Sequence, residues 1–222
     1  MADMKLVIAN KNYCLWPLAA WLCMRTAKLE FDEIVIPFDQ PDTTARMREF
    51  GPTGRVPVLK HENLTIWDSL AICEYVNELV PNARLWPKDS EARAIARSVV
   101  SEMHSGGARA ISSALDTNVR RRTKRVTPTP EIKTNIDRVI EIWRDCRNRF
   151  GSEGSFLFGH FTIADAVQAH VVNRFVTYDI ALPPDAEIYR NTIRNYPPIV
   201  EWIKEAEKET WKMERVDNLF SE

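Results

Sequence analysis

The chain has 222 residues, of which 45% are hydrophobic and 27% charged, and its formal net charge at pH 7 is −1. This length and composition allow one large core or two modest ones. A charge so close to zero creates no field that favours nucleic acid or a membrane surface, so we expect neither as a partner. The one basic run, at residues 120–125, fits a solvated helix end or loop better than a polyanion site.

Four cysteines are scattered along the chain, without a Cys-x-x-Cys pair or a histidine at metal-binding spacing. They are Cys14, Cys23, Cys73 and Cys146. The pattern predicts neither a metal site nor a disulfide framework, and it is typical of a reduced, cytoplasmic protein. The apolar stretch near the start is too short for a signal peptide or a membrane span, which supports the same location.

The first part of the chain alternates strand and helix patterns in the order βαβαββα. The predicted strands are residues 5–9, 33–36, 58–61 and 64–67, and the predicted helices are residues 16–28, 44–50 and 68–79. Pro17 is tolerated because it falls in the first turn of its helix. This order predicts a thioredoxin-like α/β domain at residues 1–80.

The loop before the third predicted strand is rich in glycine and proline, and Pro57 stands at the entrance of the strand. A proline there leaves the N–H and C=O of Val56 outside the sheet ladder, where an extended ligand can pair with them. Asp68 and Ser69 then open a helix, which they can cap, or they can hold a bound amine or carboxylate. The order and spacing of the two pieces favour a ligand site over an isolated turn and cap.

Beyond a proline-rich linker at residues 81–89, strand signals stop and helical periodicity predicts an all-α second domain at residues 90–222. Its predicted helices run from Ser90 to about Leu115, from about Glu131 to Phe150, from Thr162, and from about Pro198. Thr162 and Asp165 have the spacing of a capping box, which predicts a role in folding. His170 lies near the apolar stripe of that helix and is interpreted as a core histidine.

The Val56-Pro57 and Asp68-Ser69 pieces, with the stretch at residues 161–165, resemble the cytosolic glutathione transferase superfamily. The resemblance implies a cis Val56-Pro57 peptide bond, and a glutathione site formed by Arg55, Val56, Pro57, Asp68 and Ser69. It further implies that the helical domain lines a pocket for a small hydrophobic electrophile. Glutathione is then the co-substrate, no metal is needed, and the chain is expected to form a homodimer.

The turn between the first strand and the first helix is the predicted place of thiol activation, because helix N-termini stabilise anions. Members of the superfamily place a Tyr, Ser or Cys here. The run at residues 10–13 resembles bacterial members in which Ser follows Tyr, and here Cys14 takes that position. Cys14 can donate a hydrogen bond to the glutathione thiolate, form a mixed disulfide with glutathione, or simply pack. Tyr13 and Asn12 are rival donors, and Tyr13 can also pack.

Residues 102–107 resemble a Glu-Met-His-Ser-Gly stretch of the same bacterial group, which implies that His104, Ser105 and Arg109 face the electrophile pocket. A surface or interhelical role fits each of them equally well. The expected function is a glutathione transferase of the detoxification type. The alternatives are a thiol transferase or reductase that uses Cys14, a glutathione-dependent isomerase, and a non-catalytic glutathione-binding protein. The Ser-Ser-Cys signature of the zeta-like isomerases is absent from the turn.

Overall fold

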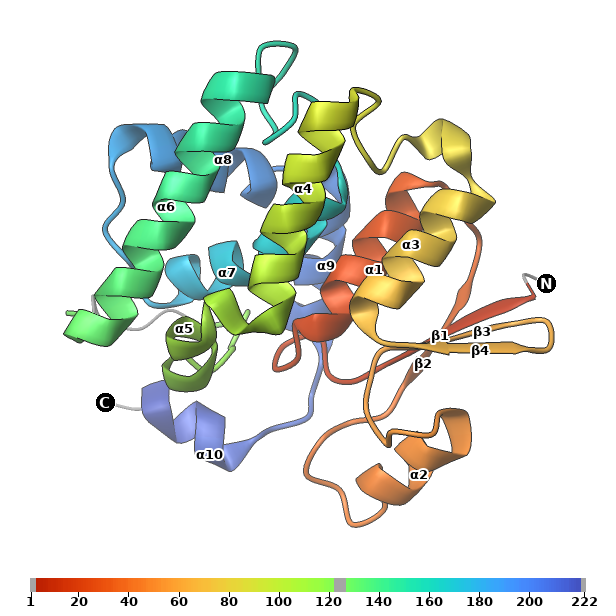
Figure 1. Cartoon of the computed structure of the whole chain (residues 1–222). Helices are drawn as coiled ribbons and strands as arrows, with labels where there is room; N and C mark the ends of the chain where they lie inside the picture. The colour runs from red at the N-terminus through yellow and green to blue at the C-terminus, as the bar shows by residue number, and fades with distance from the viewer. Residues whose placement is uncertain (1–2, 122–126, 221–222) are drawn as a thin grey trace.

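The computed structural model of the protein describes residues 3–121 and 127–220, so Arg122 to Arg125 of the basic run lie outside the described residues. Figure 1 shows a small sheet on one side of the molecule and a larger group of helices on the other. The first part contains β1 (Met4–Ile8), α1 (Trp16–Thr26), β2 (Asp32–Val35), α2 (Thr43–Phe50), β3 (Val58–His61), β4 (Leu64–Trp67) and α3 (Ser69–Leu79). The predicted order βαβαββα and the thioredoxin-like class of this domain are confirmed.

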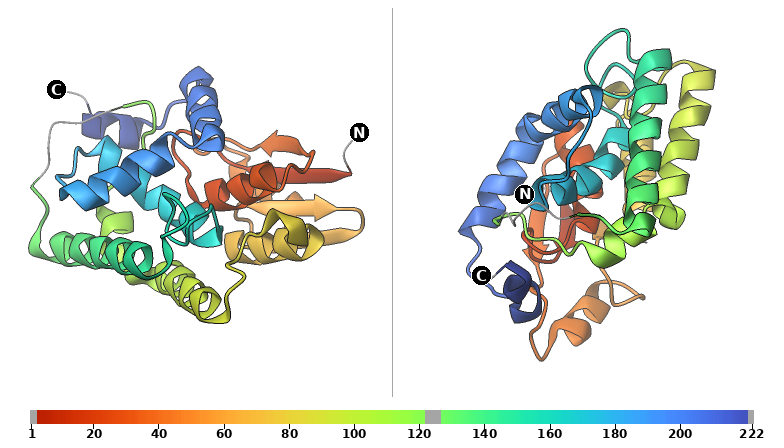
Figure 2. Two further views of the ribbon diagram at one scale, coloured as in Figure 1. Left: turned by 90° about the horizontal axis from the view of Figure 1, so that it is seen from above. Right: turned by 90° about the vertical axis from the view of Figure 1, so that its left-hand side faces the viewer.

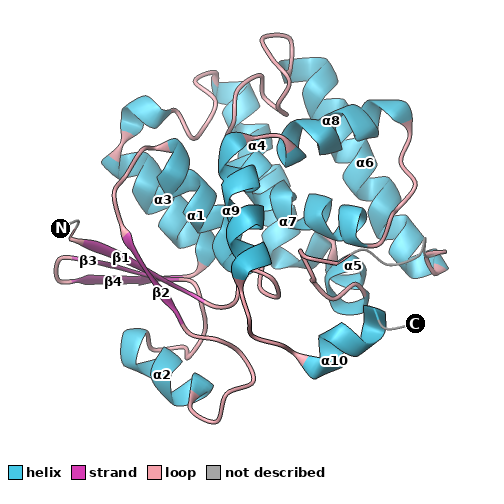
Figure 3. Cartoon of the chain, turned by 180° about the vertical axis from the view of Figure 1, so that it is seen from behind, coloured by secondary structure: helices cyan, strands magenta, loops and turns pink. Residues whose placement is uncertain are grey.

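The four strands form one mixed sheet in the order β2-β1-β3-β4, in which β1 is parallel to β2 and antiparallel to β3. Because side chains alternate along a strand, Leu6 and Ile8 join the core under α1 and α3, whereas Val7 points to the opposite face. There Val7 packs with Met47 of α2. Figure 3 shows α1 and α3 on one side of the sheet and α2 on the other.

The rest of the described chain is helical. Its elements are η1 (Pro81–Ala83), α4 (Ser90–Glu102), η2 (Met103–Gly107), α5 (Arg109–Ala114), α6 (Pro130–Phe150), α7 (Ile163–Thr177), α8 (Pro184–Arg194), α9 (Pro197–Lys208), α10 (Glu214–Asp217) and η3 (Asn218–Phe220). Helix α7 is buried along nearly its whole length and packs against α1, α4 and α8 (Figure 2). In the described ranges, no helix combines the length and the apolar character that crossing a bilayer requires.

Two features of the helical part differ from the sequence-based expectation. The predicted helix from Ser90 to about Leu115 is interrupted by the π-helical turn η2, where Gly106 has a φ of 110°. At Gly107 a Cβ atom would lie 2.7 Å from the carbonyl oxygen of Glu102, so two glycines are needed to make this bend. Helix α8 was not predicted, because Pro183 and Pro184 suggest a break although proline is well tolerated in a first helical turn.

The predicted capping box at the start of α7 is confirmed. One carboxylate oxygen of Asp165 accepts hydrogen bonds from the N–H and the hydroxyl of Thr162. The other oxygen accepts from the Leu157 N–H and the Tyr189 hydroxyl, at 3.1 and 3.0 Å. Asp165 is completely buried, so this carboxylate fixes α7 to the preceding loop and to α8. His170 is also buried, in agreement with its interpretation as a core histidine.

Candidate functional site

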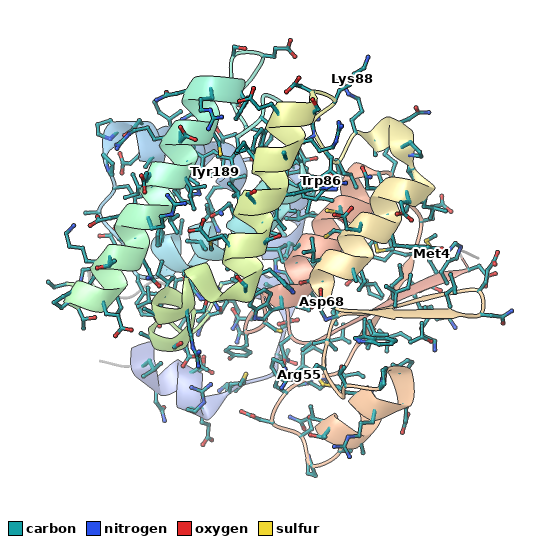
Figure 4. All side chains as sticks on the ribbon, in the orientation of Figure 1. Met4, Arg55, Asp68, Trp86, Lys88 and Tyr189 are labelled. Atoms are coloured by element: carbon teal, nitrogen blue, oxygen red, sulfur yellow. The ribbon has the colours of Figure 1, made fainter. Side chains whose placement is uncertain are left out.

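A cavity of about 370 Å³ lies where the sheet domain meets the helical part. Its lining combines the loop before β3, the start of α3, the first residue of α1 and the η2 turn. The lining residues are Trp16, Thr53, Arg55, Val56, Pro57, Trp67, Asp68, Ser69 and His104. The five residues predicted to bind a ligand, Arg55, Val56, Pro57, Asp68 and Ser69, therefore line one cavity. Figure 4 labels Arg55 below the end of the sheet and Asp68 at the start of α3.

The entrance of β3 leaves a free stretch of backbone on the cavity wall. The Val56-Pro57 peptide bond is cis, as expected, and β3 begins only at Val58. Within the described ranges, the N–H and C=O of Val56 form no backbone hydrogen bond. An extended ligand can therefore pair with Val56 in the manner of an added strand.

Asp68 links the start of α3 to the helical part. One carboxylate oxygen accepts from the N–H groups of Leu70 and Ala71, at 2.9 and 3.3 Å, which makes Asp68 the N-cap of α3. The other oxygen lies 3.1 Å from Nε2 of His104 on η2. The neighbouring Ser69 is 4% exposed. The cavity thus has a carboxylate and the N-terminus of a helix side by side, a combination suited to a ligand that carries both an amine and a carboxylate.

Trp16 lines the cavity, and its ring lies between the rings of His104 and His170. It is 39% exposed, its ring meets His104 edge-to-face with 5.9 Å between the ring centres, and it lies 5.2 Å from the ring of His170. Sequence analysis missed Trp16, Thr53 and Trp67 as lining residues. Trp16 and Trp67 directly adjoin predicted motifs, the activation turn and the Asp68-Ser69 pair, and that adjacency was the available signal.

A larger groove of about 650 Å³ lies between the last turn of α3 and the first turns of α4. It contains none of the predicted site residues. No group of three or more metal-ligating side chains with a geometry suited to an ion occurs in residues 3–121 or 127–220.

The comparisons with known proteins point to one family. Residues 13–79 match the family model of the glutathione S-transferase N-terminal domain. Over 97 residues the chain is 33% identical to the maleylacetoacetate isomerase of Mus musculus, an alignment that covers 43% of this chain and 45% of that protein. It is 26% identical to glutathione S-transferase F14 of Arabidopsis thaliana, covering 92% of this chain and 80% of the relative.

Solved structures share the whole fold. A glutathione transferase homologue from Burkholderia with bound glutathione has a TM-score of 0.68 at 21% identity, covering 93% of this chain and 98% of that one. A diazinon-metabolising glutathione S-transferase of Bombyx mori has a TM-score of 0.71 at 19% identity, covering 92% and 98%. Residues 13–79 therefore belong to the glutathione S-transferase N-terminal domain family, and the chain shares the fold of solved glutathione transferases. Its alignments with the maleylacetoacetate isomerases of mouse, nematode and rat span only 45%, 50% and 45% of those relatives.

In this fold, Cys14 lies outside the cavity lining. It is 8% exposed and packs with Val7, Met47 and Val58 on the α2 side of the sheet. Its sulfur accepts a hydrogen bond from the Trp16 N–H, but burial dominates and raises the pKa of the Cys14 thiol to about 12. Desolvation of the Cys14 thiol therefore outweighs the stabilisation of a thiolate that the helix end was expected to provide.

Tyr13 and Asn12 are held by residues from the far end of the chain. The Tyr13 hydroxyl donates to Oδ2 of Asp217 at 2.9 Å and accepts from Nη2 of Arg120 at 2.8 Å. Burial raises the pKa of Tyr13. The Asn12 side-chain oxygen accepts from the backbone N–H of Arg120, and the Asn12 N–H donates to Glu209. Neither side chain lines the cavity, so the structure brings none of the three catalytic candidates into its wall.

Of the three residues expected at the electrophile pocket, only His104 lines the cavity. The Ser105 hydroxyl bonds the carbonyl of Glu102, and Arg109 is exposed at the start of α5. Because His104 pairs with Asp68, it lies on the side of the cavity that the superfamily resemblance associates with glutathione.

Proposed function

We propose that the protein is a glutathione transferase that binds glutathione in the 370 Å³ cavity and directs its sulfur at an electrophilic carbon. One observation carries the proposal: the free backbone of Val56 and the Asp68-Ser69 helix start line the same cavity. Val56 pairs with the peptide backbone of glutathione, and Asp68 binds its γ-glutamyl ammonium group. The glutathione carboxylate at that end is held by Ser69 and the positive end of α3.

The thiol of the bound glutathione then lies toward the N-terminus of α1, whose positive end lowers its pKa. The proton leaves to solvent, the sulfur forms a bond to the electrophilic carbon, and the leaving group departs with the electron pair. With its pKa near 12 and its side chain outside the cavity lining, Cys14 stays protonated and does not act as a nucleophile. The Tyr13 hydroxyl already donates to Asp217 and also lies outside the cavity lining, so the proposal assigns activation to the positive end of α1 rather than to a side chain of the turn.

A glutathione-dependent isomerase is the second candidate. It is favoured by the 33% identity to the mouse maleylacetoacetate isomerase over 97 residues. Both activities need the same glutathione site and differ in the second substrate. A thiol transferase that uses Cys14 fits less well, because the buried thiol is far from the low pKa that mixed-disulfide chemistry requires.

Calorimetry with glutathione tests the binding step, and turnover of 1-chloro-2,4-dinitrobenzene tests the transfer step. Micromolar to millimolar binding together with glutathione-dependent release of chloride supports the transferase. Binding without turnover of this substrate, of disulfides or of maleyl compounds would leave only a glutathione-binding protein of the same fold. Absence of binding would contradict the proposal.

The assembly and location are part of the proposal. We propose a cytoplasmic homodimer, since closed two-fold pairs are the commonest soluble oligomers and the superfamily resemblance implies one. Sedimentation equilibrium over a wide concentration range tests this, and a monomer mass throughout would contradict it. We also propose that residues 1–80 and 90–222 are separate domains joined by residues 81–89. Limited proteolysis of the native protein should then cut first within residues 81–89.

A further inference from the structure

The 650 Å³ groove between the end of α3 and the start of α4 concentrates positive charge. Its lining contains one carboxylate, that of Glu78, and four cationic side chains, those of Arg84, Lys88, Arg93 and Arg97. The whole chain has 30 basic and 31 acidic residues, so this excess is a property of the groove and not of the molecule. A groove lined mainly by one sign of charge raises the local concentration of ions of the opposite sign.

Within residues 3–121 and 127–220, none of the four cations forms an ion pair. The carboxylates next to them in the chain are engaged elsewhere: Asp89 caps α4, and Glu91 pairs with Arg149 of α6 at 3.0 Å. The positive charge of the groove is therefore not neutralised by the described part of the protein. An anion from solution would neutralise it.

Two of the guanidinium groups are already held in place by the wall of the groove. Nη1 of Arg93 donates to two carbonyl groups of the 81–89 linker, at 3.0 and 2.7 Å. The guanidinium carbon of Arg97 lies 5.6 Å from the centre of the Trp86 ring, and Nε1 of Trp86 donates to Glu74 at 2.9 Å. A guanidinium has five N–H donors, so both groups keep donors for a ligand. Because their positions are fixed beforehand, a ligand loses less free energy in ordering them.

The groove is separate from the proposed glutathione cavity. Helix α3 begins beside the cavity and ends beside the groove, and its 11 residues span about 16 Å. Figure 4 shows Asp68 at the first end of α3, with Trp86 and Lys88 toward the other end and the start of α4. The two lists of lining residues have no described residue in common. A ligand in the groove and glutathione in the cavity can therefore be bound at the same time.

We propose that this groove is a second binding site, for a small organic molecule that carries two or more adjacent phosphate groups. The planar guanidinium groups of Arg93 and Arg97 match phosphate oxygens, and the exposed Lys88 supplies a further charge. Pro81 and Pro87 provide an apolar wall for the organic part. The volume lies within the range of about 300–1,000 Å³ that small-molecule sites occupy. This inference does not depend on the proposed function, because it involves no residue of the glutathione cavity.

Calorimetry of the native protein with adenosine triphosphate tests the site, with adenosine as the matched uncharged compound. At about 0.15 M salt, one triphosphate should bind per chain, and adenosine should bind at least about tenfold more weakly. Saturating glutathione should leave the affinity for the triphosphate unchanged. Inorganic tripolyphosphate separates the two parts of the ligand: weaker binding than that of the nucleotide supports a role for the apolar wall, and equal or tighter binding would overturn the organic part of the inference.

Substitution of Arg97 tests where the triphosphate binds. Arg97→Gln should weaken its binding about tenfold or more, through loss of a charged hydrogen bond, and Arg97→Lys should retain part of the affinity. Arg97 is exposed, so both variants should keep the melting temperature of the wild-type protein. Lys204→Gln is the control, since it removes one positive charge from an exposed position of α9 and should not alter binding.

Four results would overturn the inference. They are absence of triphosphate binding by the assembled protein, equal affinity for adenosine, unchanged affinity in Arg97→Gln, and displacement of the triphosphate by glutathione. The last result would place the triphosphate in the 370 Å³ cavity instead. Because glutathione is also titrated alone, failure of the proposed function is distinguished from failure of the phosphate site.

Discussion

His104 and Asp68 contact each other across the cavity, with 3.1 Å between Nε2 and Oδ2. The pair joins the π-helical turn of the helical part to the N-cap of α3. The other Asp68 oxygen is occupied by two N–H groups of α3. An incoming ammonium group therefore meets a carboxylate that is already oriented on both sides.

Replacing Asp68 should separate capping from binding. Asp68→Ala should lower the free energy of unfolding by about 0.5–2 kcal/mol through loss of the cap. It should also weaken glutathione binding by about 1–3 kcal/mol through loss of a charged hydrogen bond. Asp89→Ala is the matched control, since Asp89 caps α4 through the Ala92 N–H and does not line the cavity. Calorimetry that gives both variants the same glutathione affinity would refute a role for Asp68 in binding.

Asp165→Ala should damage folding and spare binding. The substitution leaves the donors of Thr162, Leu157 and Tyr189 without their acceptor in a fully buried site. We expect a loss of unfolding free energy of about 3 kcal/mol or more, because each unsatisfied buried donor costs about 1–3 kcal/mol. Denaturant unfolding measures the loss. Normal stability with impaired glutathione binding would place Asp165 in the ligand site instead.

His170 should make the protein sensitive to acid. Burial lowers the pKa of His170 from its ordinary value of 6.5 to about 3 in the folded chain, so below pH 6.5 the unfolded chain binds the proton first. Stability from this group is complete above pH 6.5 and falls as the pH is lowered, by at most about 1.4 kcal/mol per pH unit. His170→Gln should flatten this fall between pH 6.5 and 4.5 in denaturant unfolding. If the free energies of unfolding of the wild-type protein and of His170→Gln fell in parallel with pH, this role of His170 would be contradicted.

Cys14 should behave as a buried thiol. With its pKa raised to about 12, it should react with a thiol reagent at pH 7.5 much more slowly than an exposed cysteine, and added denaturant should remove the protection. If the thiol donates a hydrogen bond to glutathione, Cys14→Ser should keep conjugation and Cys14→Ala should lose much of it. Rapid labelling of native Cys14 that glutathione blocks would instead support a thiolate at this position.

The motifs with strong local chemistry were predictable from the sequence. The order of strands and helices in residues 1–80, the cap formed by Asp68 and the capping box of Asp165 all follow from short-range patterns, and the structure confirms them. The contacts of Tyr13 and Asn12 were not predictable, since their partners Asp217 and Glu209 lie about 200 residues away. The ionisation of Cys14 was likewise undetermined, because its burial by Met47 and Val58 depends on packing across the sheet.

Glu209 should hold the activation turn in place. Its carboxylate accepts from the N–H groups of Lys11 and Asn12, at 2.7 and 3.0 Å. Glu209→Ala should therefore speed hydrogen exchange at these two amides and lower stability by about 1–3 kcal/mol. Glu207→Ala removes an exposed carboxylate from the last turn of α9, two residues before Glu209, and should change neither. Unchanged exchange at residues 11 and 12 in Glu209→Ala would show that the turn holds its shape unaided.

The contact between Glu209 and the turn also bears on how the chain is made. The strands that pair with β1 are β2 and β3, which are synthesised soon after it. Glu209, in contrast, follows Lys11 by 198 positions. A nascent chain can form its sheet and dock α1 while residues 11–13 still lack their acceptors. The β1–α1 turn is therefore completed only after α9 has been made, so a chain stalled within α9 should present the loop before β3 and the α3 start without an ordered activation turn.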